Sequence, residues 1–283
     1  MKIRSLLFAP GDSERKMTKA LECGADGVIL DLEDSVAPAA KLAARGLVAA
    51  ILGGRSGVVV RVNPRGTEWY LADLAAVVRG RPAAVMLPKC AGVGDLVALD
   101  HHLEALEVGA GLPVGGILAL PIVSETAASV FGLGGYAGAP RLLALCFGAE
   151  DISADLGIAP RIVDMSYPAP VAAARAAVLL AAGAAGVPAI DTPWPDPRDP
   201  DGLTREAAVA ASDGFAGKLC IHPGQIAAVN AAFTPDEARI AWARRVERAF
   251  AENPHAGVFA LEGKMIDRPH LKLARRILAT VEP

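Results

Sequence analysis

The stretch GVILDLEDSV, at residues 27–36, contains the structural unit that decides the fold. Its first six residues, 27–32, are almost all apolar, and the apolar run gives way directly to Glu33 and Asp34. A short run that is apolar at successive positions, rather than at alternate ones, is typical of a parallel strand that is buried on both faces. We therefore predict a buried strand at residues 27–32 with carboxylates at its carboxyl end.

The same pattern occurs eight times, and an Ala-rich helical segment separates most of the runs. The runs are residues 5–9, 27–32, 58–62, 83–87, 116–120, 142–147, 188–190 and 218–221. Eight strands that alternate with helices predict a (β/α)8 TIM barrel, and 283 residues is close to the roughly 250 typical of that fold. A doubly wound open sheet is the structural alternative.

Capping residues predict where the helices begin. Asp12 or Ser13 can cap a helix that ends near Gly24, and Pro38 suits the first turn of a helix that ends at residues 53–54. The Pro- and Asp-rich residues 191–201 predict a loop over the seventh strand. Roughly 60 residues follow the eighth strand, with helical stretches near 235–253 and 268–281. We expect the barrel at residues 1–232 and a C-terminal helical extension at residues 233–283.

Composition excludes several classes of protein. Lys and Arg number 28 against 31 Asp and Glu, so the net charge of −3 offers no footprint for nucleic acid. No apolar run is long enough to predict a membrane span. The four cysteines, Cys23, Cys90, Cys146 and Cys220, form no C-x-x-C pair. Without a signal-like N-terminus, they predict reduced thiols in a cytoplasmic protein.

Charged or polar residues follow nearly every predicted strand, at the end of the barrel where catalytic groups lie in this fold. Any single one has a structural explanation, because loops begin with polar residues and carboxylates cap helices. The set is harder to explain, because carboxylates outnumber cations around one rim. These residues are Asp31, Glu33, Asp34, Arg61, Asn63, Lys89, Glu125, Glu150, Asp151, Asp191 and His222.

The excess of carboxylates predicts a bound cation, since the cluster would otherwise repel itself. Oxygen ligands select a hard ion, and two carboxylates with open positions suit Mg²⁺ or Mn²⁺. His222 is more typical of a hydrogen-bonded scaffold residue, and Cys146 and Cys220 are more typical of small core residues. We do not include these three in the site.

Eight short motifs are spread over nearly the whole chain. They are RSLLFAPGD (4–12), LDLEDSV (30–36), VRVNP (60–64), LPK (87–89), SETA (124–127), FGAED (147–151), GKLCIHP (217–223) and EGKMID (262–267). Each is weak evidence by itself, but in this order they resemble the citrate lyase beta-subunit-like family, which includes the malyl-CoA and citramalyl-CoA lyases.

The resemblance implies a (β/α)8 barrel that assembles as a homotrimer or a hexamer. It also implies that Glu125 and Asp151 hold Mg²⁺ and that Arg61 contacts the substrate near the bond being broken. By the same resemblance, the extension contributes to a neighbouring subunit, where Asp267 supplies an acid/base group. The alternative for Asp267 is the cap of the helix in whose first turn Pro269 lies.

Coenzyme A is, by the same resemblance, part of the substrate, and the first βα loop helps to hold it. The basic candidates in this region are Arg15, Lys16 and Lys19. A solvated helix face explains the same three residues equally well.

Glu33 and Asp34 are expected behind the substrate, where they organise Arg61 or a water at the metal. Asp31 is more typical of a structural residue. The chain departs from the related pyruvate aldolases, which have a His at the position of Asp34, and it has Ser124 where the family often has an apolar residue. The missing His argues against simple pyruvate aldolase chemistry and for a thioester substrate.

The implied reaction is the Mg²⁺-dependent cleavage of a 3-hydroxyacyl-CoA, such as malyl-CoA or citramalyl-CoA, into acetyl-CoA and a 2-oxo acid. Two alternatives remain: a citrate lyase beta subunit that acts on a carrier-protein-bound citryl thioester, and a non-catalytic barrel with an interaction role. Arg61, Glu125, Asp151 and Asp267 together favour an enzyme, and the long extension favours a free-standing one. The oxo acid stays open, because a methyl group is worth only about 1–3 kcal/mol in a pocket.

Overall fold

The computed structural model describes residues 2–163, 165–253 and 257–281. Eight parallel strands form one sheet in the order β5-β4-β3-β2-β1-β8-β7-β6. The strands are β1 Ser5–Pro10, β2 Gly27–Asp31, β3 Val58–Arg61, β4 Ala84–Leu87, β5 Leu118–Pro121, β6 Leu145–Cys146, β7 Ala189–Asp191 and β8 Gly217–Cys220. All eight lie within or next to the runs that the sequence predicts.

The edge strands β5 and β6 meet and close the sheet. Ala119 bridges Leu142 and Ile122 bridges Cys146, both in parallel orientation. The Val123 amide also donates to the Cys146 carbonyl at 3.1 Å. Regular pairing in β6 is limited to two residues, fewer than the six predicted at 142–147, and the bridge at Leu142 marks the irregular start of this strand. The predicted (β/α)8 barrel is confirmed, in preference to the open sheet.

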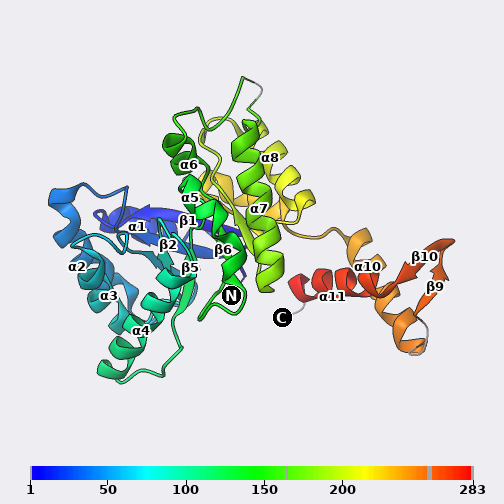
Figure 1. Cartoon of the computed structure of the whole chain (residues 1–283), viewed down its shortest axis with the longest axis horizontal. Helices are drawn as coiled ribbons and strands as arrows, with labels where there is room; N and C mark the ends of the chain where they lie inside the picture. Colours follow the sequence, from blue (N-terminus) through cyan, green and yellow to red (C-terminus); the bar gives the residue numbers. More distant parts are fainter. Residues whose placement is uncertain (1, 164, 254–256, 282–283) are drawn as a thin grey trace.

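Helices connect successive strands and surround the barrel (Figure 1). They are α1 Glu14–Leu21, α2 Lys41–Leu52, α3 Tyr70–Val77, α4 Val93–Gly109, α5 Ala127–Phe131, α6 Ala149–Asp155, α7 Ala169–Ala185, α8 Pro200–Asp213 and α9 Ile226–Ala232. Ser13, rather than Asp12, caps α1, and its hydroxyl accepts from the Lys16 amide. Pro38 lies in a single 3₁₀ turn, Pro38–Ala40, that leads directly into α2.

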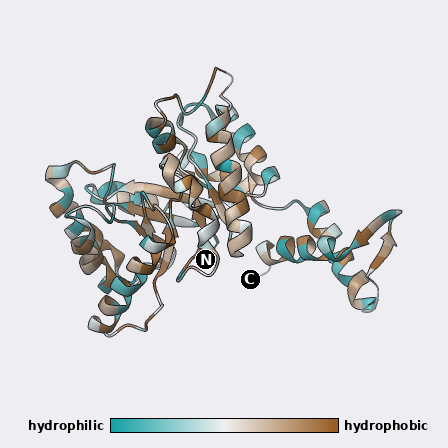
Figure 2. Cartoon of the chain, in the orientation of Figure 1, coloured by the Kyte–Doolittle hydropathy of each residue, from teal (hydrophilic) through white to brown (hydrophobic). Residues whose placement is uncertain are grey.

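The strands bury side chains on both faces. Ile29 packs with Leu6 and Val59 in an apolar cluster that fills the barrel. Its neighbours Val28 and Leu30 belong to the larger cluster between the sheet and the helices. This double burial explains why the strand sequences are apolar at successive positions. Figure 2 shows the strands as mainly hydrophobic, with hydrophilic residues on the surrounding loops.

The elements after α9 form what we call the C-terminal arm, residues 233–281, which extends away from the barrel (Figure 1). It consists of α10 Glu237–Glu252, the antiparallel strands β9 Val258–Leu261 and β10 Lys264–Asp267, and α11 Arg268–Val281. The arm has a small apolar core of its own, formed by Ala243, Val246, Ile266, Ala274, Ile277 and Leu278.

The two helices of the arm were predicted from the sequence, but the hairpin between them was not. The hairpin turns at Glu262 and Gly263, which both have positive φ, at 52° and 77°, as in a type I′ turn. Its strands have only four residues each and are largely exposed, so they lack a long apolar run. None of the helices in the described part of the chain is long and apolar enough to cross a membrane.

Candidate active site

Arg61, the last residue of β3, is held rigidly at the carboxyl end of the barrel. Its Nε and Nη2 donate to the two carboxylate oxygens of Asp31, at 2.7 Å each. Its Nη1 lies 2.8 Å from Glu33 Oε2. The guanidinium also stacks over the Phe8 ring, 4.7 Å from its centroid. These contacts fix the plane of the guanidinium and leave the side chain 12% exposed.

Asp31 anchors Arg61 and the turn that follows β2. It is 1% exposed and accepts the backbone amides of Glu33 at 2.9 Å and Ser35 at 3.1 Å. Burial disfavours the charge of Asp31, but the hydrogen bonds and the charge of Arg61 outweigh it and hold the pKa of this carboxyl below its usual range. These contacts support the structural interpretation of Asp31.

Lys89 lies at the centre of the acidic residues. Its Nζ is 2.6 Å from Glu33 Oε1, 3.3 Å from Asp151 Oδ1 and 3.5 Å from Asp34 Oδ2. Burial disfavours its charge, but the pairing with Glu33 prevails and raises the pKa of Lys89 above its usual range. For Glu33 the balance is the opposite. Burial raises the pKa of this carboxyl more than the charges of Arg61 and Lys89 lower it. One lysine thus links three predicted carboxylates.

Sequence reasoning placed Lys89 on the rim but not among the site residues. The available signals were the LPK motif and its position after the fourth strand. The backbone of Lys89 has φ of 51°, a left-handed conformation that is uncommon outside glycine and that often occurs at functional sites. In this conformation the Lys89 amide donates to the carboxylate of Glu125, while its side chain reaches Glu33 and Asp151.

Glu125 is almost completely enclosed, at 3% exposure. A Cβ at Gly148 would lie 3.0 Å from Glu125 Cγ and 3.0 Å from Ile122 Cγ2, so the absence of a side chain there makes room for this carboxyl. Burial, and secondly the charge of Asp151, raise the pKa of Glu125 from 4.5 to about 8. Asp151, in the first turn of α6, is more open, with 36% of its side chain exposed.

The charges of this cluster suit a divalent cation. Five carboxylates, those of Asp31, Glu33, Asp34, Glu125 and Asp151, share the cations of Arg61 and Lys89. Within the described ranges, no three His, Cys, Asp or Glu side chains form a closed metal cage. Glu125 and Asp151 could hold such an ion through two carboxylate ligands, with positions left for water or substrate, an arrangement common for Mg²⁺.

Asp267 is not part of this cluster in the same chain. It ends β10 on the C-terminal arm, and its Oδ1 lies 2.6 Å from Nδ1 of His270. Figure 1 shows this hairpin projecting away from the barrel. The side chain is one-third exposed, so it is accessible to another molecule.

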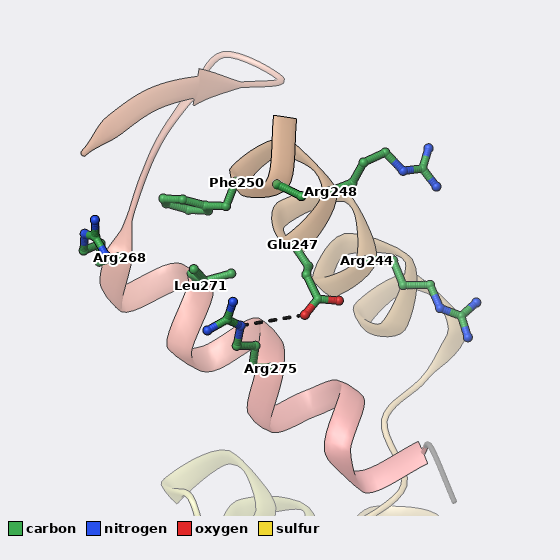
Figure 3. Close-up of a pocket in the computed structure, with 8 residues that line it drawn as sticks. Arg244, Glu247, Arg248, Phe250, Arg268, Leu271 and Arg275 are labelled. Atoms are coloured by element: carbon green, nitrogen blue, oxygen red, sulfur yellow. Dashed lines mark ion pairs between the residues drawn. The ribbon is translucent and has the colours of Figure 1, made fainter. Parts of the chain in front are cut away.

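The arm is basic next to Asp267. A groove of about 710 Å³ runs between α10 and α11 (Figure 3). Its lining residues are Arg244, Glu247, Arg248, Phe250, Ala251, Arg268, Leu271 and Arg275. Glu247 is the one carboxylate among them and lies 3.7 Å from Arg275. This surface is electrostatically complementary to the carboxylate-rich rim of the barrel.

The basic residues of α1 also lie outside the cluster. Arg15, Lys16 and Lys19 are all exposed on this helix. Arg15 and Lys19 border a shallow depression of about 470 Å³ that they share with Glu14 and Glu22. The two carboxylates balance the two cations there, so α1 by itself is a weak electrostatic match for phosphate groups.

A (β/α)8 barrel with a buried carboxyl of raised pKa, an adjacent carboxylate and a rigid arginine at the carboxyl end of its strands fits the class of barrel enzymes that use an oxygen-ligand metal site. Comparison with known families makes the assignment specific. Residues 4–223 match the HpcH/HpaI aldolase/citrate lyase family, and the chain belongs to this enzyme family.

Individual relatives agree over nearly the full length. The chain is 35% identical to a (3S)-malyl-CoA thioesterase of Cereibacter sphaeroides, over 99% of this chain and 94% of that protein. It is 33% identical to the citrate lyase subunit beta of Haemophilus influenzae, over 97% and 95% respectively. The crystal structure of Mycobacterium tuberculosis CitE with magnesium, acetoacetate and coenzyme A is similar at TM-score 0.79 and 36% identity, covering 99% of this chain and 98% of that one.

Proposed function

We propose that the chain is a free-standing, Mg²⁺-dependent lyase that cleaves the carbon–carbon bond of a 3-hydroxyacyl-CoA, giving acetyl-CoA and a 2-oxo acid. The observation that carries the proposal is the buried Glu125 carboxyl near Asp151, which a chain of contacts through Lys89 and Glu33 links to the fixed Arg61. Relatives crystallised with magnesium and coenzyme A, and with magnesium and oxaloacetate, support it.

Glu125 and Asp151 would hold the ion. When bound, Mg²⁺ supplies a Lewis acid that polarises an oxygen of the hydroxy acid and neutralises part of the carboxylate charge. Mn²⁺ has similar ligand preferences and could replace it.

Arg61 is placed to stabilise the negative charge that develops on the substrate. When the acid/base group takes the proton of the 3-hydroxyacyl hydroxyl, the carbon that bears this oxygen becomes the carbonyl of the oxo acid. The electrons of the broken C–C bond pass to the thioester, which leaves as an enolate. Asp31 and Glu33 hold the guanidinium in place beforehand, so little reorganisation is needed during the reaction.

Asp267 of a neighbouring subunit is, in this proposal, the acid that returns a proton to the enolate carbon and so forms acetyl-CoA. Three observations support a contribution in trans. The hairpin lies away from the barrel of its own chain (Figure 1), Asp267 is accessible, and the arm is basic where the rim is acidic. A homotrimer or a hexamer would allow every site to be completed in this way.

In this proposal, the segment that follows β1 binds the coenzyme A end of the substrate. Arg15, Lys16 and Lys19 are exposed and on the helix that follows β1. Lysine and arginine side chains bind phosphate groups through charge-assisted hydrogen bonds, which is why these three remain the candidates for contacting coenzyme A.

A panel of malyl-CoA, citramalyl-CoA and citryl-CoA, incubated with the purified chain alone, tests this function. We expect acetyl-CoA and an oxo acid to appear with Mg²⁺ and not with EDTA. A second candidate function comes from the relative named (3S)-malyl-CoA thioesterase. Thioester hydrolysis would instead release free coenzyme A and the intact hydroxy acid, which is malate in the case of malyl-CoA. A chain that acts only on a carrier protein would leave all three CoA thioesters intact.

A further inference from the structure

Lys41, the first residue of α2, is a buried cation without a counter-ion. It is 6% exposed, and among the described carboxylates none forms an ion pair with it. Its ammonium group donates instead to two backbone carbonyls, those of Leu32 at 2.9 Å and Glu33 at 3.0 Å. On another side it faces the ring of Trp69, 5.0 Å from the centroid. Burying an unpaired charge costs free energy. The groups to which Lys41 is hydrogen-bonded therefore indicate its role.

The two carbonyls lie on either side of Glu33. The Leu32 carbonyl belongs to the peptide group that enters Glu33, and the Glu33 carbonyl belongs to the one that leaves it. The side chain of Glu33 is the group that bridges Arg61, at 2.8 Å, and Lys89, at 2.6 Å. Lys41 therefore fixes the backbone on both sides of Glu33, the residue whose carboxylate contacts both cations of the candidate active site.

A second set of contacts, made by residues that follow β3, also fixes the Leu32 carbonyl. Asn63 Nδ2 donates to the Leu32 carbonyl at 3.0 Å and to Asp73 at 2.6 Å. Asp73 is in turn fixed by Arg45 Nε at 2.8 Å. Arg45 lies one turn after Lys41, so the first two turns of α2 fix the ends of both β2 and β3.

We propose that Lys41 is a positioning residue for the active site. Its ammonium group fixes the turn after β2 so that Glu33 can hold Arg61 and Lys89 at once. Among the described residues, no hydrogen bond or ion pair joins Lys41 to the side chains of the rim, so its effect is exerted through the backbone of Glu33. Only an ammonium group has several donors on a compact centre that can satisfy two neighbouring carbonyls from one buried position.

The first test is a double-mutant cycle of Lys41→Met and Glu33→Gln; its catalytic readout rests on the lyase function proposed above. We expect Lys41→Met to lower kcat roughly tenfold to hundredfold, as loss of a supporting contact in an active site does. KM for the thioester should change little, because Lys41 is buried and its hydrogen bonds go to backbone carbonyls. In the Glu33→Gln background the same substitution should lower kcat by no more than about twofold. A change of that size is within the scatter seen for substitutions that do not interact. An equal loss in both backgrounds would overturn the proposal.

The second test needs no activity. Hydrogen exchange of the Glu33 and Ser35 amides, which are bonded to Asp31, should become roughly tenfold faster or more in Lys41→Met, as the loss of two hydrogen bonds predicts. Arg141→Met is the matched control. It removes another buried cation, one that pairs with Asp100 and Glu107 and precedes β6 at the opposite end of the barrel.

Arg141→Met should destabilise the fold without altering exchange in residues 31–36. Unchanged exchange in Lys41→Met, or equal acceleration in both variants, would overturn the positioning role. If the wild type lacks lyase activity and Lys41→Met nevertheless shows the selective acceleration, the result would contradict the proposed function and leave the role of Lys41 in holding Glu33 intact.

Discussion

Glu125→Gln tests the buried carboxyl on which the metal assignment rests. The substitution keeps the shape of the side chain and removes its ability to ionise. In the wild type, burial and the charge of Asp151 raise the pKa of Glu125 from 4.5 to about 8. Between these two pH values the folded chain retains a proton that the unfolded chain has released, so the free energy of unfolding falls as the pH rises. Below this window both states are protonated, and above it the loss is complete.

The size of the effect follows from the linkage of one proton. Each pH unit inside the window costs about 1.36 kcal/mol. From pH 5.5 to 7.5, Glu125 therefore takes about 2–3 kcal/mol from the free energy of unfolding of the metal-free protein. The glutamine variant lacks this contribution, while the other titrating groups are largely shared and cancel in the difference.

Urea unfolding of both proteins in EDTA, at pH 5.5 and 7.5, measures this difference. We expect the stability of the wild type relative to Glu125→Gln to fall by about 2–3 kcal/mol between the two values. Added Mg²⁺ at pH 7.5 should stabilise the wild type, with release of a proton, and should leave the variant nearly unchanged. The same pH dependence in both proteins, or a wild type that gains relative stability with rising pH, would refute the reasoning.

Three further experiments test the other assignments. Arg61→Lys should remain folded but lose roughly a hundred- to a thousandfold in kcat, because lysine lacks the planar fork that holds Asp31 and an oxyanion together; near-normal turnover would make Arg61 a scaffold residue. Inactive Arg61→Ala and Asp267→Ala chains, mixed under subunit exchange, should recover part of the activity, whereas a site completed within one chain could recover none. Arg15→Glu combined with Lys19→Glu should raise KM for CoA thioesters with little change in kcat, and an unchanged KM would exclude α1 from binding.

The barrel and the cluster of charged residues at one of its rims were predictable because burial on both faces leaves a strong sequence pattern. Runs such as 27–32 are almost entirely apolar and are followed by charged residues, so both the strand and the charged rim at its carboxyl end can be predicted from one stretch. The same reasoning brought Glu33 and Arg61 together, since β2 and β3 are neighbours in a parallel sheet.

Contacts that depend on an unusual backbone conformation or on how a helix packs were not predictable from the sequence. The central place of Lys89 depends on a left-handed residue after β4, and a lysine has no sequence signature for that conformation. Lys41 looks like a surface residue at the start of a helix, and its burial appears only once α2 packs against the exit of β2. The hairpin of the arm has short, exposed strands, so its sequence lacks a clear strand pattern between the two predicted helices.

The location of a bound ion tests the central claim most directly. Crystals equilibrated with Mn²⁺, whose anomalous scattering identifies it, should show one ion between the carboxylates of Glu125 and Asp151. The Lys89 ammonium, which lies 3.3 Å from Asp151 Oδ1 in the present structure, should lie farther from that oxygen when the ion is bound. An ion bound elsewhere, or a saturated crystal in which Lys89 keeps its contact with Asp151 and no ion touches Glu125, would contradict the proposed metal site and the lyase mechanism that depends on it.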